Sequence, residues 1–540
     1  VHDVVVIGSG ASGGMTAYNL TKKGVKVLML DAGSKFDPDG FWSHVSPYES
    51  IERQQNGESP PSAYLSTREQ PYLTPEGKPF DLVRVWGWGG KTNVWGRLSL
   101  RMSDLDFAAA ERDGWGIPWP IRYADIAPYY DRVEQLIGIC GGTDSSDSLP
   151  GSKHYLPPPA FRCAEVIVKN SAQAMGIPVV PVRRAVLTQR HRGFPPCHYC
   201  GACGRGCRTS SFFNATDYLL ADALETGRLQ IVSNAVVARV LVDDEGRANG
   251  VQYFDRTSGH EEQVRARTVV VAASTMDSTR ILLNSRSPQH PNGLGNGSDQ
   301  VGRNYCEQVR THVKAFLPQL FDAGYSNDDG ISSGHAYIPR FNHRLGKLDY
   351  LRGFGIQMWA TGCRTTGEEV ASAVPGFGAT FKREVKKKYP SLVQLHPYAE
   401  TLPTPDNRVT VDESQTDAYG VPLMKISVSF GENERKITRH MVTTCLEILD
   451  NAGAEIMPTD LEKVDVAGSA IHEHGTCRMG DEPKLSVVDK FQRMHEVPNV
   501  WVADGSVFPN ASEKNPTLSI LALSWRASDY LAESLRRGDA

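Results

Sequence analysis

Long hydrophobic runs are missing from this sequence of 540 residues. No stretch approaches the ~18 consecutive apolar residues that a membrane-spanning helix needs, and the longest runs, such as 268–273, are short and rich in β-branched residues. No signal-peptide pattern is visible ahead of the first apolar segment, so none is expected from this sequence. We therefore expect no membrane span and a cytoplasmic location. Export to the periplasm, with a partner or behind a removed signal, stays open because the first residue is not Met.

Cysteine and net charge are also low. Ten Cys are too few for a secreted disulfide scaffold. Lys and Arg (58) nearly balance Asp and Glu (62), for a net charge of −4, so we expect neither nucleic acid nor an anionic membrane as the main partner. Hydrophobic residues at 40% and charged residues at 22% exclude wholesale disorder. At about 150 residues per domain, the length predicts two or three domains.

Glycine, by contrast, is abundant at 50 residues, and it gathers in motifs. Residues 3–7 (DVVVI) predict a buried strand, 15–23 a helix, and 25–30 a second strand that ends at Asp31. Between the first strand and the helix, residues 8–13 (GSGASG) form the G-x-G-x-x-G pattern of dinucleotide-binding folds. The context of strand, glycine turn, helix, strand and acid favours a nucleotide site over a glycine turn without a ligand.

Each glycine of this pattern has a separate task. Gly8 allows a sharp turn, Gly10 lets the backbone approach a pyrophosphate, and Gly13 lets the helix pack closely on the strand. Free N–H groups at the helix N-terminus favour phosphate. Asp31 can accept hydrogen bonds from both ribose hydroxyls, which disfavours NADP. The pattern by itself fits FAD and NAD equally.

The far end of the chain favours the larger of these cofactors. Residues 499–503 predict a buried strand that runs into Asp504 and Gly505, and Pro516 can start an apolar helix at its first turn. A nucleotide fold built from both chain ends is explained better by an extended cofactor than by NAD.

Seven motifs in order carry a family resemblance: 8–13 with 31–33, 88–96 (WGGKTNVWG), 269–274 (VVVAAS), 301–304 (VGRN), 472–480 (HEHGTCRMG), 504–506 (DGS) and 515–517 (NPT). With these motifs the sequence resembles, essentially end to end, the glucose–methanol–choline (GMC) flavoprotein oxidoreductases, in particular the pyranose oxidase and gluconate (sugar) dehydrogenase branch. The resemblance implies an α/β protein with a Rossmann-like FAD-binding domain made of discontinuous segments, at 1–105, 205–315 and 465–540. It implies an α+β substrate-binding domain with an antiparallel sheet at 106–204 and 316–464.

The predicted substrate domain has residue patterns of its own that suit a sheet. Four segments are predicted to be strands that form the floor of the pocket: 350–360, 392–400, 408–412 and 423–428. Residues 432–452 are predicted to form a long amphipathic helix.

The resemblance also assigns the FAD contacts. They are expected at Gly8, Gly10, Ala11, Ser12, Gly13, Asp31, Ala32, Gly33, Trp88, Gly89, Gly90, Thr92, Asn93, Val94, Trp95, Val237, Ala273, Ser274, Asp504, Gly505, Asn515, Pro516 and Thr517. In pyranose-oxidase-like relatives a His in the 88–96 segment can bond the flavin covalently. Val94 aligns with that His, so we predict non-covalent FAD.

Alcohol oxidation needs a base for the hydroxyl proton, and histidine suits that task because its pKa lies near neutrality. The resemblance places the base at His472 and a hydroxyl-orienting partner at Asn515. We expect Gln357, Trp359 and His474 near the substrate, with Tyr337 and Gln394 as further pocket candidates. A metal pair of His472 and His474 lacks a third ligand, so no metal is predicted there.

Four of the ten Cys are clustered, at Cys197, Cys200, Cys203 and Cys207. Their spacing matches that of bacterial ferredoxins, but Arg208 stands where proline usually follows. Three interpretations stay open: structural or disulfide thiols, an Fe–S cluster, and a zinc site. The missing proline favours structural thiols.

The leading functional prediction is an FAD-dependent oxidoreductase of a CH–OH group in a sugar, polyol or glycoside. It would pass hydride to the flavin and electrons to oxygen or another external acceptor. The alternatives are a GMC enzyme of a hydrophobic alcohol or sterol, and a flavo-Fe–S subunit of a dehydrogenase complex. Each of these predictions is compatible with a small electron-transfer or chaperone subunit as a partner and with a homo-oligomer.

Overall fold

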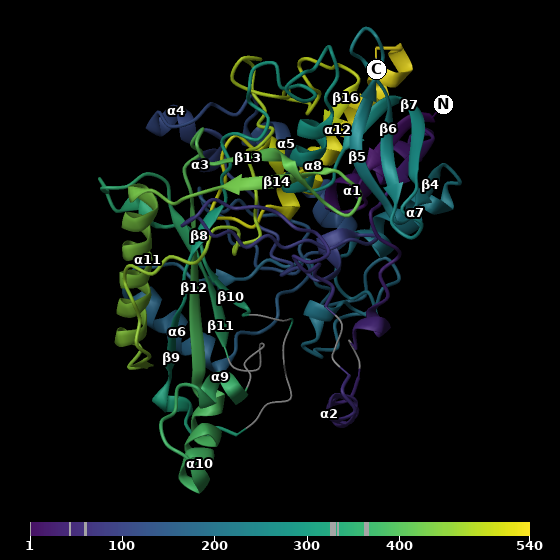
Figure 1. Ribbon diagram of the computed structural model, residues 1–540. Helices are drawn as coiled ribbons and strands as arrows, with labels where there is room; N and C mark the ends of the chain where they lie inside the picture. The colour runs from purple at the N-terminus through teal and green to yellow at the C-terminus, as the bar shows by residue number, and fades with distance from the viewer. Residues whose placement is uncertain are drawn as a thin grey trace.

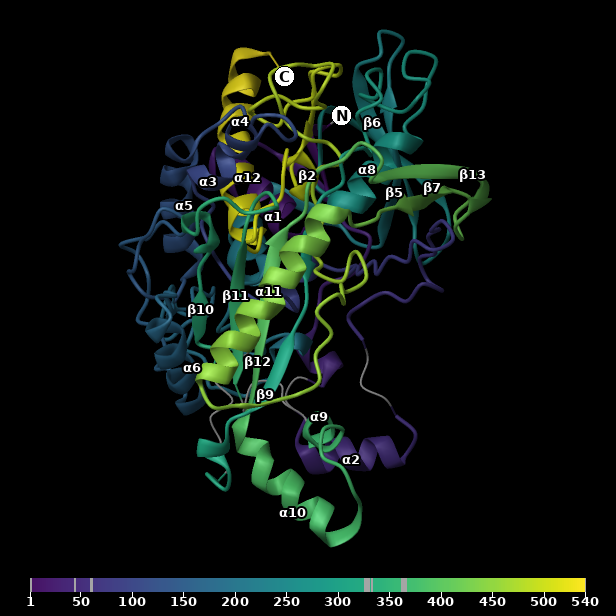
Figure 2. The ribbon, with the colours of Figure 1, turned by 90° about the vertical axis from the view of Figure 1, so that its left-hand side faces the viewer.

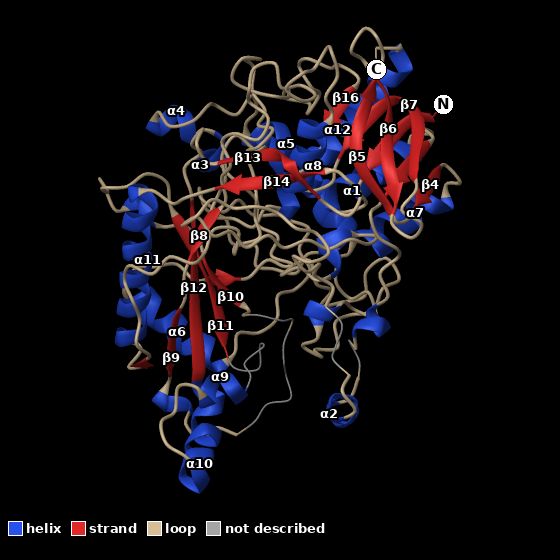
Figure 3. Ribbon diagram, viewed as in Figure 1, coloured by secondary structure: helices blue, strands red, loops and turns tan. Residues whose placement is uncertain are grey.

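The computed structural model describes residues 2–42, 45–58, 62–324, 331, 334–360 and 367–539. Two large β-sheets occupy different ends of the molecule (Figures 1 and 3): one lies near both chain termini, and the other runs alongside a long helix. The predicted class, α/β with a separate antiparallel sheet, is confirmed.

The sheet near the termini is mostly parallel. Its strand order is β4-β2-β1-β7-β6-β5, and β16 also pairs with β7. The four strands β4, β2, β1 and β7 and the strand β16 run parallel, while β5, β6 and β7 form an antiparallel meander. The bounds are β1 (His2–Ile7), β2 (Val27–Leu30), β4 (Leu229–Val232), β5 (Ala235–Val242), β6 (Ala248–Asp255), β7 (Glu261–Val271) and β16 (Val500–Val502).

Helices from the two chain ends lie against this sheet, next to each other. Helix α1 (Ala11–Lys22) starts within the glycine motif, and α12 (Thr517–Arg537) follows Pro516. The Asn19 amide donates to Ser528 Oγ at 2.8 Å and to Asp529 Oδ1 at 2.7 Å, which ties the two helices together. The predicted contribution of both ends to one fold is therefore confirmed. Helices α7 (Ala221–Glu225) and α8 (Thr275–Asn284) complete this body.

The second sheet is antiparallel, with strand order β15-β9-β12-β11-β10-β3, and β8 pairs with β12. Helix α11 (Glu432–Asn451) crosses one face of this sheet (Figure 2), and its Ile437, Met441 and Ile448 share a core with Val393 and Ile356 of the strands. Helix α6 belongs to the same core. The bounds are β3 (Val180–Pro181), β8 (Gln308–Arg310), β9 (Val313–Phe316), β10 (Ala336–Ile338), β11 (Phe354–Ala360), β12 (Leu392–Glu400), β15 (Glu455–Ile456) and α6 (Cys163–Ala174).

Two of the predicted pocket strands lie elsewhere. Residues 408–412 and 423–428 form the hairpin β13 (Arg408–Thr416) and β14 (Pro422–Ser427), a separate two-stranded sheet. Val409 and Ile426 on this hairpin pack with Phe80, Met276 and Tyr305 near α8, so their apolar faces are buried away from the large antiparallel sheet. The prediction that these strands floor the pocket is wrong.

Two segments pack against elements of the other predicted domain. Helix α5 (Tyr123–Ile137), from the predicted substrate domain, packs on α12, and the Tyr130 hydroxyl lies 2.6 Å from Ser519 Oγ. Strands β8 and β9, from the predicted FAD domain, pair with β12. Short helices complete the chain: α2 (Pro47–Gln55), α3 (Asp104–Phe107), α4 (Ala109–Asp113), α9 (Gly367–Ala371) and α10 (Gly378–Lys388). Among the described helices, none has both the length and the hydrophobicity to cross a bilayer.

Candidate active site

A single cavity joins most of the residues that the sequence singles out. The glycine motif lines one part of it, and His472 lines another together with Gln357 and Trp359 of β11. Eighteen of the predicted FAD contacts line it: Gly8, Gly10, Ala11, Ser12, Asp31, Ala32, Gly90, Thr92, Val94, Trp95, Val237, Ala273, Ser274, Asp504, Gly505, Asn515, Pro516 and Thr517. Ser9, which was not predicted, lines it as well. Gly13, Gly33, Trp88, Gly89 and Asn93 are described but do not line it.

The glycines of the first motif differ in what surrounds them. A Cβ on Gly13 would lie 1.9 Å from the carbonyl oxygen of Gly8, and one on Gly8, where φ is +95°, would lie 2.5 Å from that of Ala272. A Cβ on Gly10 would meet no atom within 4 Å, because Gly10 faces the cavity at the start of α1. This open cradle at a helix N-terminus, without a side-chain cap, suits a pyrophosphate.

Asp31 holds the glycine motif in place as well as lining the cavity. Its carboxylate accepts hydrogen bonds from the backbone N–H groups of Ser9 (3.1 Å) and Gly33 (2.9 Å) and from the Ser9 hydroxyl. Burial raises the pKa of Asp31, and these hydrogen bonds oppose the rise. The Ser9 hydroxyl in turn accepts from the N–H of Gly89 at 3.0 Å, so Asp31 couples the first motif to the 88–96 segment.

The 88–96 segment contains a short 3₁₀ turn, Gly90–Asn93, and its own side chains fix its shape. Asn93 Nδ2 donates to the carbonyls of Trp88 (2.8 Å) and Gly90 (2.9 Å), which explains why Asn93 supports the cavity wall without lining it. Lys91 pairs with Glu473 at 3.2 Å, and this ion pair connects the segment to the His472 motif. Val94 lines the cavity.

The predicted catalytic residues lie within hydrogen-bonding distance. Asn515 Nδ2 lies 3.2 Å from His472 Nε2, and Gln357 Nε2 donates to Asn515 Oδ1 at 3.2 Å. The other ring nitrogen, His472 Nδ1, lies 2.7 Å from Gln308 Oε1. Burial lowers the pKa of His472 to about 3, with His474, Arg310 and Lys91 adding to the effect. The imidazole is therefore neutral near pH 7 and can accept a proton from a hydroxyl.

Gln308 is a site residue that the sequence reasoning missed. It lies on β8, only four residues after the 301–304 motif, and is 2% exposed. Its amide nitrogen donates to the carbonyls of Ser512 (2.5 Å) and Lys514 (2.9 Å). The only sequence signal for Gln308 is its position next to the 301–304 motif. The residues with which Gln308 forms hydrogen bonds lie 164 to 206 positions away, so no local pattern could reveal it.

One face of the antiparallel sheet floors the cavity near His472. Gln357 and Trp359 of β11 stand opposite His396 and Gln394 of β12, so all four share this face. Trp359 stacks on His396 with ring centroids 4.0 Å apart, and Arg310 and Tyr398 extend the same floor. Gln394 and Tyr337 do not line the cavity: Gln394 donates to Glu369 at 2.9 Å, and Tyr337 lies over Gly355.

His474 does not take the place expected of it. Its backbone pairs with Cys306, its ring stacks on Phe508 with centroids 4.7 Å apart, and it is 1% exposed. It does not line the cavity that contains His472. The His474 side chain lies in the packing beneath the motif, so a contact with substrate, as predicted from the sequence, would need a change in this packing.

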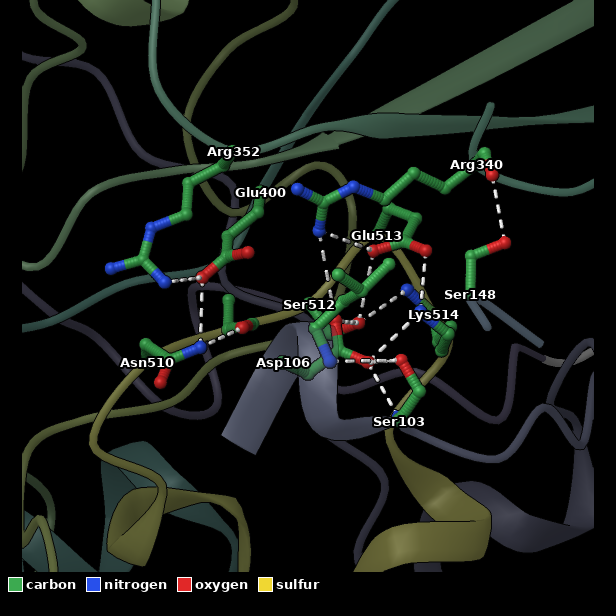
Figure 4. Close-up of polar contacts among 12 residues, drawn as sticks. Ser103, Asp106, Ser148, Arg340, Arg352, Glu400, Asn510, Ser512, Glu513 and Lys514 are labelled. Carbon is green, nitrogen blue, oxygen red and sulfur yellow. Dashed lines mark hydrogen bonds and ion pairs between the residues drawn. The ribbon is translucent and has the colours of Figure 1, made fainter. Parts of the chain in front are cut away.

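A buried network of charges lies beside the segment that carries Asn515 (Figure 4). Lys514 Nζ contacts Asp106 at 3.0 Å and also Glu513, while Ser512 Oγ donates to Asp106 at 2.9 Å. Arg340 approaches Asp106 and Glu513 at 3.9 Å. Burial alone would raise the pKa of Asp106, but the charges of Lys514 and Arg340 override it and hold the pKa below its usual value. We call Asp106, Arg340, Glu513 and Lys514 the buried charge cluster.

The four clustered cysteines are free thiols of differing burial. Cys203 is buried, Cys197 and Cys207 are half-buried, and Cys200 is exposed. Burial raises the pKa of Cys197 to about 12, and the neighbouring thiols add to this rise. Within the described ranges, no group of three or more His, Cys, Asp or Glu side chains is placed to hold a metal ion.

Comparison with known proteins agrees with this geometry. A family model described as GMC oxidoreductase matches residues 76–310 with its N-terminal part and 403–524 with its C-terminal part. The chain is 30% identical to a 6'''-hydroxyparomomycin C oxidase from Streptomyces lividus (99% of this chain, 92% of the other). It is 25% identical to a fructose dehydrogenase large subunit from Gluconobacter japonicus (99% and 98%). A solved FAD-dependent oxidoreductase from Chaetomium thermophilum has the same fold (TM-score 0.67, 15% identity, 99% and 100% covered).

Proposed function

This chain belongs to the GMC oxidoreductase family, and from that premise we propose that it oxidises a CH–OH group of a sugar or related polyol to a carbonyl. Membership of the family implies FAD binding and an oxidoreductase of alcohol or sugar groups. The observation that supports the proposed chemistry best is the pair of His472 and Asn515, 3.2 Å apart at the cavity.

We assign the proton step to His472. Its Nε2 would accept the hydroxyl proton of the substrate, because the ring is neutral and the atom lies at the cavity. Asn515 would orient the same hydroxyl through its amide, and Gln357 would hold that amide in position. FAD, when bound, supplies the chemistry of accepting hydride at flavin N5.

The cavity has residues to hold FAD. The open cradle at Gly10 suits the pyrophosphate, and Asp31 retains acceptor capacity for ribose hydroxyls beside its bonds to Ser9 and Gly33. Val94 lines the cavity at the position where a covalent His would stand, and valine cannot form that bond. We propose non-covalent FAD, which acid denaturation should release into solution; flavin that stays with the precipitate would refute this.

A sugar is favoured over a long apolar alcohol by the floor of the cavity. Trp359 offers an aromatic face, while Gln357, Arg310 and Tyr398 offer polar groups beside it. Two of the relatives named above act, by their names, on 6'''-hydroxyparomomycin C and on fructose. We therefore place the substrate's hydroxyl-rich ring on Trp359 and its reacting carbon near His472.

The test is a substrate panel under anaerobic conditions. Purified holoprotein is mixed with pyranoses, open-chain polyols, fatty alcohols and sterols, and loss of oxidised-flavin absorption is followed. We expect reduction by at least one sugar or polyol; reduction by fatty alcohols or sterols alone would refute the sugar assignment. Oxygen consumption against dye reduction then identifies the acceptor, which we propose to be oxygen or a small external oxidant.

We propose a structural role for the cysteine cluster. Cys203 is buried in an apolar cluster with Leu98 and Phe212, and Arg208 stands where a proline usually follows the last ferredoxin cysteine. Replacing Cys203 by Ser should lower stability and leave the choice of acceptor unchanged. Stoichiometric iron and sulfide in protein handled without oxygen, or loss of transfer to a large acceptor in that variant, would instead support a cluster.

A further inference from the structure

The two ring nitrogens of His472 cannot both serve as the base. A neutral imidazole carries its proton on one nitrogen and a lone pair on the other, and the partner of one nitrogen decides which form is present. Nε2 faces Asn515 and the cavity, whereas Nδ1 faces Gln308 at 2.7 Å. The base is competent only if the proton sits on Nδ1.

The orientation of the Gln308 amide follows from its other neighbours. One end of the amide lies 2.5 Å from the carbonyl oxygen of Ser512 and 2.9 Å from that of Lys514. Carbonyl oxygens only accept hydrogen bonds, so the NH₂ group must point at them. The amide oxygen is therefore the atom that faces His472. Because this oxygen also only accepts, Nδ1 must donate, and it carries the proton.

We propose that Gln308 is a positioning residue that fixes His472 as the Nδ1–H tautomer and so keeps the lone pair on Nε2, the nitrogen that faces Asn515 and the cavity. The catalytic consequence rests on the proposed function, in which His472 is the base. Gln308 is 2% exposed, and among the described residues the hydrogen bonds of its side chain go to His472 and to the carbonyls of Ser512 and Lys514. Of these three residues only His472 is proposed to contact substrate, so Gln308 acts through His472.

The same segment sets both partners of His472. Ser512 and Lys514 supply the carbonyls that orient Gln308, and Asn515 follows directly. Within the buried charge cluster, Lys514 is held by Asp106 and Glu513 faces Arg340 (Figure 4). The loop at 512–515 thus positions the contact at His472 Nδ1 and the contact at His472 Nε2. The buried charge cluster holds this loop in place.

The direct test reads the tautomer of His472 by ¹⁵N NMR of histidine-labelled holoprotein. The His472 signals are identified as those missing from His472→Gln. In the wild-type protein we expect a protonated Nδ1 and an unprotonated Nε2. In Gln308→Met, which keeps the side-chain length and removes the acceptor, we expect the Nε2–H tautomer to appear. A wild-type ring already protonated at Nε2, or an unchanged tautomer in the variant, would overturn the inference.

Anaerobic flavin reduction by substrate gives the second readout. Loss of an orienting partner typically costs about 10–100-fold in activity, and we expect that loss in the rate constant at saturating substrate, with little change in apparent affinity. Gln308→Asn serves if the Met variant folds poorly, because its shorter amide cannot span from Ser512 to His472. The matched control is Gln252→Met, a buried amide on β6 that bonds Arg239, with an unchanged rate expected.

The two measurements separate this inference from the proposed function. A changed tautomer with an unchanged rate of flavin reduction would support the contact between Gln308 and His472 and refute His472 as the base. An unchanged tautomer with a lowered rate would refute the positioning role and leave His472 as the base.

Discussion

His472 meets two requirements of a base before substrate arrives, because it is neutral and one nitrogen faces the cavity. Replacing His472 by Ala should slow flavin reduction by substrate about 10²–10⁴-fold, or about 3–5 kcal/mol of barrier, while FAD stays bound. Asn515→Ala should lose less, since Asn515 orients the hydroxyl without accepting its proton. Anaerobic stopped-flow measures both; near-normal reduction in His472→Ala would refute His472 as the base.

The lowered pKa of His472 also predicts a pH dependence. A base works in its neutral form, so activity is present above its pKa and lost as the pH falls through it. With a pKa of about 3, the rate constant for flavin reduction should be flat from about pH 5 to pH 8 and fall only below that range. A limb centred near pH 6.5, the value of an unperturbed histidine, would contradict the buried environment described for this ring.

At the scale of elements, two glycines at the start of α1 have different roles: Gly10 leaves room for the cofactor, and Gly13 allows the helix to pack. Gly10→Ala adds a Cβ where no protein atom lies within 4 Å, so the melting temperature of the apoprotein should stay within a degree or two, while FAD affinity falls. Gly13→Ala adds a Cβ 1.9 Å from the Gly8 carbonyl, so that variant should lose stability itself.

Thermal unfolding of the two apoproteins and FAD titration check this pair. Equal melting temperatures for Gly10→Ala and Gly13→Ala would contradict the difference in packing. Full FAD affinity in Gly10→Ala would show that no part of the cofactor approaches this turn.

The elements that the sequence predicts well are those with local signals. Residues 392–400 form β12 with the predicted bounds, and the helix predicted at 432–452 is α11. The hairpin β13–β14 was misplaced because the pattern of Val409 and Ile426 shows only that one face is buried, whereas the partner surface is chosen by tertiary packing. The start of α1 at Ala11 was also missed, since Gly13 and Gly14 disfavour a helix until packing on β1 compensates.

In the site, too, the sequence predicts the residues that have a local signal and misses those that depend on tertiary contacts. His472 and Asn515 were predicted because each stands in a motif with a recognisable order of residues. Gln308 and Asp106 were not, because neither has a meaning until the fold brings Ser512 and Lys514 next to it. Their roles depend on contacts between residues 204 to 408 positions apart, and such contacts leave no local pattern.

At the scale of the whole molecule, the buried charge cluster joins parts of the chain that are distant in sequence. Lys514→Met would leave Asp106 and Glu513 buried with one positive neighbour fewer. Breaking a buried pair in this way typically costs about 3–5 kcal/mol of unfolding free energy. We expect a loss of that size in urea denaturation, together with weakened flavin reduction, because the loop that carries Asn515 loses its anchor.

The matched control is an ion pair at the surface. Arg439 and Glu462 bond each other with side chains 60% and 56% exposed, so Arg439→Met should change the unfolding free energy by less than about 1 kcal/mol. Equal effects of Lys514→Met and Arg439→Met would mean that burial adds nothing to the cluster.

The pairing of β16 with β7 and of α12 with α1 has a consequence for how the protein is made (Figure 1). At about 5–20 residues per second, a ribosome needs roughly half a minute to two minutes for a chain of this length. During nearly all of that time α1 lacks its neighbour, and the nucleotide cavity lacks the wall that Asn515 and Thr517 supply. FAD can therefore be enclosed only after β16 and α12 have been synthesised. A chain that stops before β16 and α12 would lack this wall of the cavity, so we expect it to be cleared by proteases and not to accumulate as an inactive flavoprotein.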